Sequence, residues 1–247
     1  MMTGISRVAA LLTPTARVTV LTGAGVSAAS GVPTFRGSGG LWKSFRPEDL
    51  ATPQAFARDP STVWEWYDWR RGLIAGCAPN AAHHVLASWS RRWPRFTLIT
   101  QNVDGLHERA GTGRVVRLHG SIWEVGCWDD CGRTPRRWRD DRVPIAPPPQ
   151  CDACGGLLRP GVVWFGESLD PRDISAATDA ADCDVFLTIG TSAIVYPAAG
   201  LLDIARAHGA TTVEINPDAT AATATVDVAL AARAEEALPA IDGKVSS

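Results

Sequence analysis

Amide, carboxylate and imidazole side chains follow two short apolar segments in the middle of the chain. The segments are 95–100 and 114–118, and the polar side chains that follow them are Gln101, Asn102, Asp104 and His119. Both segments are β-prone, and ligands of parallel sheets gather at the carboxyl ends of the strands. Amides and carboxylates can orient a ligand, and an imidazole with a pKa of about 6.5 suits a general base at neutral pH. The sequence therefore predicts an active site at this edge of a sheet.

The elements that must position these side chains alternate between strands and helices, as in a parallel α/β sheet. Apolar, strand-like segments cover residues 18–21, 95–100, 114–118, 184–189, 211–215 and 225–230. Helix-compatible stretches separate several of them. We expect two interruptions of this pattern: a tryptophan-rich helical insertion over residues 37–90, and a small module over residues 126–160, where Cys, Gly, Pro and Arg dominate.

A glycine-rich loop follows the first strand-like segment. Gly23, Gly25 and Ala28 fit the G-x-G-x-x-G/A pattern, in which small residues let backbone N–H groups approach a pyrophosphate at a helix N-terminus. A dinucleotide is the ligand that this pattern predicts, and a plain strand-to-helix turn is the alternative. No clear acidic residue follows about 20 positions later, as it does in ordinary hydride-transfer enzymes.

Four of the six cysteines form two close pairs in the module 126–160. Cys127 and Cys131 are separated by three residues, Cys151 and Cys154 by two, and nineteen residues lie between the pairs. Four thiolates complete a tetrahedral zinc site and leave no position open, so we predict a structural zinc. A disulfide pair or a metal-free loop is the alternative. A nucleic-acid-binding zinc ribbon is disfavoured because acidic residues offset the arginines of this module.

Composition and charge limit the partners. The chain has 247 residues, 45% of them hydrophobic, and a formal net charge of −2 with a pI of about 6.2. No global field favours nucleic acid or an anionic membrane, and no stretch approaches the roughly 18 apolar residues of a membrane span. Residues 1–16 lack the charged and apolar regions of a signal peptide. With paired cysteines typical of a reducing compartment, these features predict a cytoplasmic protein.

Six motifs, taken together and in this order, resemble the sirtuin family. They are GAGVS at 23–27, PTFR at 33–36, TQNVD at 100–104, LHG at 118–120, VWFGE at 163–167 and GTS at 190–192. The resemblance covers about residues 17–240. It implies an NAD-dependent protein lysine deacylase with a small zinc domain and a Rossmann-like large domain, here formed by residues 1–36, 91–125 and 161–247. In two respects the chain departs from the family: Ala29 stands where many members carry Glu, and the first cysteine pair is spaced by three residues.

The resemblance also implies roles for the site residues. His119 would be the base that activates a ribose hydroxyl of NAD, Asn102 would bond the ribose, and Asp104 would hold the nicotinamide carboxamide. Phe35 would shield the reactive ribose from water, and Arg36 would lie near the phosphates. The remaining contacts to NAD are expected from Gly23, Ala24, Gly25, Ala28, Thr34, Gln101, Gly190, Thr191, Ser192, Asn216 and Ala234.

The acyl group is predicted from Tyr67 and Arg70, which are three residues apart and would share one face of a helix. A guanidinium binds a carboxylate bidentately and a phenol adds a donor, so the pair suits a succinyl, malonyl or glutaryl chain. Within the sirtuin resemblance it looks like the signature of desuccinylases and demalonylases. Arg71 should face elsewhere and matter less.

Acylated lysine side chains of proteins are the expected substrates, and the wall of the acyl-lysine tunnel is expected from Val163, Trp164 and Phe165. The peptide itself would add to the strand that these residues continue. Products would be free lysine, nicotinamide and O-acyl-ADP-ribose. A general deacetylase or mono-ADP-ribosyltransferase is an alternative enzyme, and a non-catalytic NAD- and zinc-binding module is the alternative class. The sequence makes no prediction about self-association.

Overall fold

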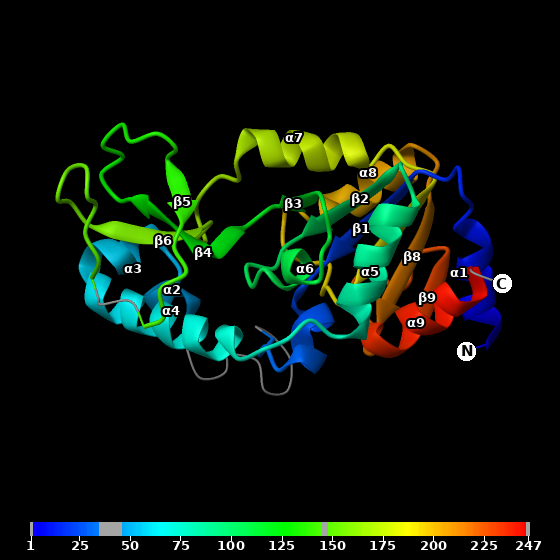
Figure 1. Cartoon of the computed structure of the whole chain (residues 1–247). Coiled ribbons are helices and arrows are strands. Elements are labelled where there is room, and N and C mark those ends of the chain that lie inside the picture. Colours follow the sequence, from blue (N-terminus) through cyan, green and yellow to red (C-terminus); the bar gives the residue numbers. More distant parts are fainter. Residues whose placement is uncertain (1, 35–45, 145–147, 246–247) are drawn as a thin grey trace.

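The structure is a computed structural model that describes residues 2–34, 46–144 and 148–245. Its centre is a six-stranded sheet in which all neighbouring strands are parallel (Figure 1). The strands are β1 (Val18–Thr22), β2 (Phe96–Thr100), β3 (Val115–Arg117), β7 (Val185–Ile189), β8 (Thr211–Asn216) and β9 (Val228–Ala231). All six strand-like segments predicted from the sequence are confirmed as members of this sheet.

The strand order is β3-β2-β1-β7-β8-β9, which is the order of a Rossmann fold. The chain runs outward from β1 in one direction and from β7 in the other, so a crevice opens at the carboxyl ends of these two strands. Both faces of the sheet are covered. The helices α1 (Met2–Leu11), α5 (Ala81–Arg92) and α9 (Ala234–Val245) pack on one face, and α7 (Pro171–Ala180) and α8 (Gly200–Ala207) pack on the other (Figure 1).

A second lobe contains a three-stranded antiparallel sheet and three helices. Its strands, in the order β5-β4-β6, are β4 (Gly120–Cys127), β5 (Arg137–Arg139) and β6 (Leu158–Val162). The helices are α2 (Pro47–Leu50), α3 (Pro53–Arg58) and α4 (Pro60–Ala75). They share a hydrophobic core of their own with the small sheet, which contains Phe56, Trp64 and Trp164.

The lobe boundaries differ from those expected. The predicted helical insertion ended at residue 90, but α5 packs on the large sheet through Ala82, Leu86 and Trp89. The predicted module began at residue 126, whereas the small sheet begins with β4 at Gly120 and ends with β6 at Val162. Glycine, proline and arginine within these strands obscured their β character in the sequence. Among the described residues, no helix is both long and apolar enough to span a membrane.

Candidate functional site

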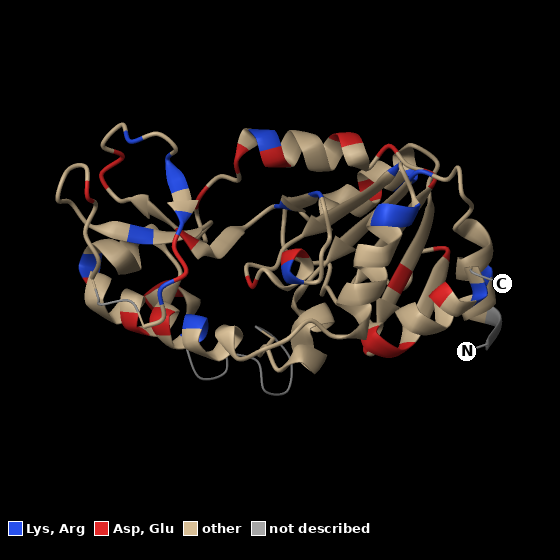
Figure 2. Ribbon diagram, viewed as in Figure 1, with Lys and Arg blue, Asp and Glu red and all other residues tan. Residues whose placement is uncertain are grey.

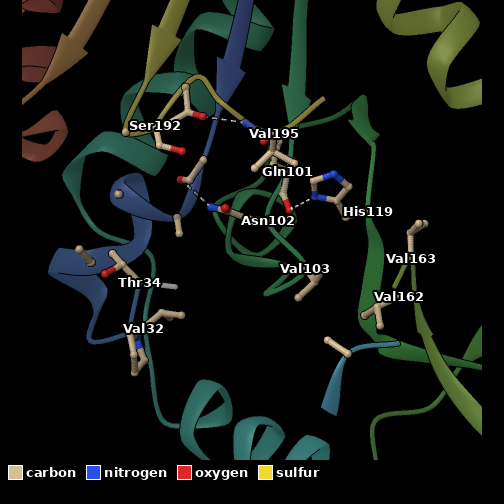
Figure 3. A pocket seen from close by; sticks show the side chains of 18 of the residues that line it. Val32, Thr34, Gln101, Asn102, Val103, His119, Val162, Val163, Ser192 and Val195 are labelled. Atoms are coloured by element: carbon tan, nitrogen blue, oxygen red, sulfur yellow. Dashed lines mark hydrogen bonds between the residues drawn. The ribbon is translucent and has the colours of Figure 1, made fainter. Parts of the chain in front are cut away.

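A cavity of about 1250 Å³ lies between the carboxyl edge of the large sheet and the small lobe (Figure 3). It is lined by the loops after β1, β2, β7 and β8, and by side chains of α4 and of the segment after β6. Sites for single small ligands usually measure 300–1,000 Å³. The cavity is therefore larger than a usual site for one small ligand.

The glycine loop after β1 packs directly against the loop after β7. The N–H of Gly23 donates to the carbonyl of Ile189 at 3.0 Å, and that of Gly25 donates to the carbonyl of Gly190 at 2.8 Å. A Cβ at Gly25 would lie 2.7 Å from the Cα of Gly190, so the glycines permit this close approach of two backbones. The amides of Gly23 and Gly25 are thus bonded within the protein.

The loop itself forms a 3-10 helix, Ala24–Ser30, which begins directly after Gly23. Asn80, which caps α5, holds it in place: its Nδ2 donates to the carbonyl of Val26 at 2.9 Å and to Ser30 Oγ at 3.0 Å. Ala28 lines the cavity, but Ala29 does not and is exposed. Ala29 therefore forms no part of the described cavity wall.

Ser27 joins Asn102 and Asp104 in a buried polar network that the sequence did not reveal. Its hydroxyl donates to Asp104 Oδ2 at 2.8 Å and accepts from Asn102 Nδ2 at 3.2 Å. Its third partner is His83 Nε2 at 3.3 Å; since the N–H of Asn80 donates to His83 Nδ1, the ring proton is on Nε2. Burial lowers the pKa of His83 to about 4, so this ring stays neutral and donates to Ser27.

Asp104 lies in the wall behind the cavity and does not line it directly. Besides Ser27, it accepts from the N–H of Leu106 at 2.9 Å, and burial raises its pKa. Asn102 does line the cavity, and its Nδ2 also donates to the carbonyl of Gly23 at 3.1 Å. The network thus ties the loop after β2 to the glycine loop after β1 and fixes the direction of the Asn102 side chain.

His119 stands at the junction between the two lobes, directly before β4, and lines the cavity (Figure 3). Its Nδ1 lies 3.0 Å from the carbonyl oxygen of Gln101, so Nδ1 carries the ring proton and donates it there. Nε2 is then the basic nitrogen. Desolvation lowers the pKa of His119 below 6.5, and the ring is therefore neutral and able to accept a proton at neutral pH.

The loops after β2, β7 and β8 are joined at the far end of the cavity. Gln101 Nε2 donates to Thr191 Oγ1 at 2.9 Å, and Asn216 Nδ2 donates to the carbonyl of Thr191 at 2.9 Å. All three residues line the cavity, as do the predicted residues Thr34, Gly190, Ser192 and Ala234. The sequence did not suggest Arg233 or Glu235, which line the same end. No motif pointed to them, because they lie on α9 and its approach.

Tyr67 and Arg70 lie on α4 and line the end of the cavity inside the small lobe. Tyr67 is only 2% exposed and Arg70 only 6%. The guanidinium carbon of Arg70 lies 4.8 Å from the centroid of the Trp66 ring and 5.9 Å from that of the Tyr67 ring. Burial lowers the pKa of Arg70, since desolvation penalises its charge.

Arg71, next along the helix, does not line the cavity. It is fully buried and its Nε donates to the carbonyl of Ile122 at 2.8 Å, with Asp140 at 3.7 Å from Nη1. It faces away from the Tyr67 and Arg70 pair, as expected, yet it connects α4 to β4 and so stabilises the lobe.

Val163, Trp164 and Phe165 follow β6 and line the cavity. The N–H of Val163 donates to the carbonyl of His119 at 2.9 Å, so this segment passes next to the histidine. β6 is an edge strand of the small sheet. Phe35 and Arg36, both predicted NAD contacts, lie outside the described residues.

The four paired cysteines converge at the tip of the small lobe. Their Sγ atoms all lie within 4.8 Å of one another, with 3.6 Å between Cys127 and Cys154 and 3.9 Å between Cys131 and Cys151. Four sulfurs bound tetrahedrally to zinc at 2.3 Å would be about 3.8 Å apart. The cluster therefore has the donor set and the spacing of a structural zinc site, and none of the four thiols is in a disulfide.

The arginines around the zinc site do not form a basic surface. Figure 2 shows Lys and Arg interspersed with Asp and Glu over the small lobe. Several of these side chains form ion pairs, namely Arg133 with Asp152, Arg136 with Asp130, Arg139 with Asp141 and Arg142 with Asp140. Charge neutralisation of this kind gives no support to a nucleic-acid-binding ribbon.

Comparison with known proteins identifies relatives that are similar in sequence and in fold. Residues 23–197 match the Sir2 family. The NAD-dependent protein deacylase of Aquifex aeolicus (strain VF5) is 52% identical over 212 residues, 85% of this chain and 87% of that protein. The structure of a Sir2 homologue in complex with NAD superimposes with a TM-score of 0.87 at 44% identity, covering 100% of this chain and 94% of that one. A Sir2 protein bound to a myristoylated histone peptide gives 0.80 at 32% identity, over 100% and 98% of the two chains.

Proposed function

This chain belongs to the Sir2 family of NAD-dependent protein deacylases, and we propose that it preferentially removes acidic acyl groups, succinyl and malonyl, from protein lysines. The observation that carries this proposal is the buried Tyr67 and Arg70 pair in the wall of the cavity. Acetyl groups would be removed more weakly, because they offer no carboxylate to these two side chains.

Burial supports a role for Arg70 in ligand binding. A buried guanidinium has lost part of its hydration, and a carboxylate brought in by the acyl chain would compensate that loss by charge-assisted hydrogen bonds. Tyr67 would add a neutral donor, since burial raises the pKa of its phenol and keeps the hydrogen in place. A related protein binds a myristoylated peptide, so relatives of this chain accept acyl groups of different chemistry.

We assign the remaining roles by position in the cavity. NAD would lie along the loops after β1, β2, β7 and β8, and it supplies the ribose carbon that receives the acyl oxygen. His119 would take a proton from a ribose hydroxyl through Nε2, because Nδ1 is bonded to Gln101. Asn102 would orient the ribose. Asp104, which was predicted to hold the nicotinamide carboxamide, does not line the described cavity and would instead hold Asn102 and the local backbone in place through Ser27.

Val163 and Trp164 would form the wall of the channel through which the acylated lysine reaches His119. The edge strand β6 and the segment after it offer backbone groups to which an extended peptide could pair. Recognition of this kind depends little on peptide sequence, so many acylated proteins could serve as substrates.

Substitution of Arg70 tests the proposed selectivity. We expect Arg70→Met to reduce kcat/KM for a succinylated peptide on the order of 10- to 100-fold, the loss of a charge-assisted pair. The same peptide in acetylated form should lose far less, so the ratio of the two values collapses. Equal losses for the two peptides would contradict the proposal and favour a general deacetylase.

A further inference from the structure

Tyr67 receives a hydrogen bond from across the cavity wall. The indole Nε1–H of Trp164 donates to the phenolic oxygen of Tyr67 at 2.9 Å. The two residues are 97 positions apart, one in α4 and one directly after β6, and each is 2% exposed. Both line the cavity. The bond therefore joins the proposed acyl-binding helix to the segment that passes next to His119.

This hydrogen bond restricts the direction in which Tyr67 can donate. A phenol has one hydrogen to donate and lone pairs that accept, whereas an indole N–H can only donate. Trp164 occupies an accepting position on the Tyr67 oxygen, so the phenolic hydrogen must point away from the indole. Desolvation raises the pKa of Tyr67, and the hydrogen is therefore retained at neutral pH.

The indole of Trp164 is itself in contact with two other side chains. The guanidinium carbon of Arg159 lies 3.8 Å from the centroid of its ring, and the Phe56 ring centroid lies 5.3 Å away. Glu167 accepts from the backbone N–H of Trp164 and from Arg159 Nη2, each at 2.8 Å. Since these contacts fix the ring plane and the backbone together, the indole N–H has little freedom to leave Tyr67.

We propose that Trp164 determines acyl selectivity by acting through Tyr67, whose hydrogen it directs toward the acyl carboxylate. The inference rests on the proposed function, because only an acyl chain that ends in a carboxylate can receive this hydrogen. The apolar surface of Trp164 would contact any acyl chain. Its N–H, acting through Tyr67, would favour only acyl chains that end in a carboxylate.

The experiment compares Trp164→Phe with the wild type on one lysine peptide in succinylated and acetylated forms, with NAD. Phenylalanine keeps an aromatic ring in the wall and removes the N–H. We expect the ratio of kcat/KM for succinyl over acetyl to fall about 3- to 10-fold, the effect of one hydrogen bond, mainly through a higher KM for the succinylated peptide. In a Tyr67→Phe background, the same substitution should change the ratio less than twofold, because the phenol is already gone.

Trp64→Phe is the matched control. Trp64 is also a fully buried tryptophan of the small lobe, and its Nε1 donates to the carbonyl of Leu158 at 2.8 Å, but it does not line the cavity. This variant loses an indole hydrogen bond and the same side-chain volume. We expect its succinyl-to-acetyl ratio to stay within twofold of the wild-type value. Thermal melts of all the variants would verify that they fold.

Three results would overturn the inference. Equal losses of desuccinylation and deacetylation in Trp164→Phe would mean that Trp164 only forms part of the cavity wall. A similar fall of the succinyl-to-acetyl ratio in Trp64→Phe would mean that the effect comes from general packing. Failure of the proposed function would look different, since Arg70→Met would then leave the ratio unchanged. If the succinyl-to-acetyl ratio falls in Arg70→Met but is unchanged in Trp164→Phe, the inference about Trp164 is wrong and the proposed function stands.

Discussion

A backbone hydrogen bond fixes His119 in the tautomer that carries its proton on Nδ1. Its Nδ1 is bonded to the carbonyl of Gln101 at 3.0 Å, and its position directly before β4 puts the ring between the two lobes. A base in this tautomer needs no reorientation before it accepts a proton through Nε2. The ring thus has a fixed orientation, and burial lowers its pKa, which keeps it unprotonated at neutral pH.

The pH dependence of the reaction should reflect this ring. Desolvation lowers the pKa of His119 from 6.5, and the base acts only when unprotonated. Activity should therefore be complete above pH 6.5 and be lost as the pH falls through the lowered value. Measurement of kcat/KM for the acylated peptide against pH reports the free enzyme. An acid limb with its midpoint above 6.5 would contradict this assignment.

At the scale of elements, the approach of two loops holds the cofactor end of the cavity together. Gly190 has a φ of +60°, and a Cβ on it would lie 2.5 Å from the amide nitrogen of Val26. Gly209 also has a positive φ, +84°, but a Cβ there would meet nothing within 4 Å. Substitution of Gly209 would therefore cause backbone strain only, whereas substitution of Gly190 would cause strain and a clash between the two loops.

We expect Gly190→Ala to weaken NAD binding at least 10-fold, because the loops after β1 and β7 must move apart. Gly209→Ala should destabilise the fold by about 1–2 kcal/mol through strain alone and leave NAD affinity within twofold. Isothermal titration with NAD and chemical denaturation of both variants would measure the two effects. Equal NAD affinities in the two variants would argue against a role for loop packing in cofactor binding.

The strands of the large sheet were predictable because burial on both faces makes them short, nearly continuous apolar runs. Those of the small sheet were not, because Gly126, Pro160 and Gly161 interrupt β4 and β6. The site motifs were read from local spacing. The hydrogen bonds of the Ser27 hydroxyl and of the Trp164 indole could not be predicted, since their partners lie 56 to 97 positions away and only the fold brings them together.

At the scale of the whole molecule, the zinc cluster and Arg71 support one wall of the cavity from outside. Cys127 is the last residue of β4 and Cys131 follows it, while Cys151 and Cys154 precede β6; Arg71 connects α4 to β4. Neither touches the cavity. The metal would therefore act on the reaction only by holding β4 and β6, and the residues that follow them, in place.

Removal of zinc should loosen the small lobe selectively. We expect one zinc per chain in the wild type and in Cys77→Ser, and loss of zinc and of deacylation in Cys151→Ser. Hydrogen exchange after chelation should lose protection in β4 and β6 but keep it in β1 and β7, which have a separate core. Full activity without zinc, or uniform loss of protection in both sheets, would contradict a local structural role.

The measurement that tests the central claim most directly uses the wild-type protein and one lysine peptide in acetyl, succinyl and malonyl forms. Each form is incubated with and without NAD, and mass spectrometry records both the peptide and the nucleotide products. The buried Tyr67 and Arg70 pair predicts NAD-dependent loss of succinyl or malonyl that is faster than loss of acetyl, with O-acyl-ADP-ribose and nicotinamide formed. Faster removal of acetyl would contradict the claim that this pocket selects acidic acyl groups.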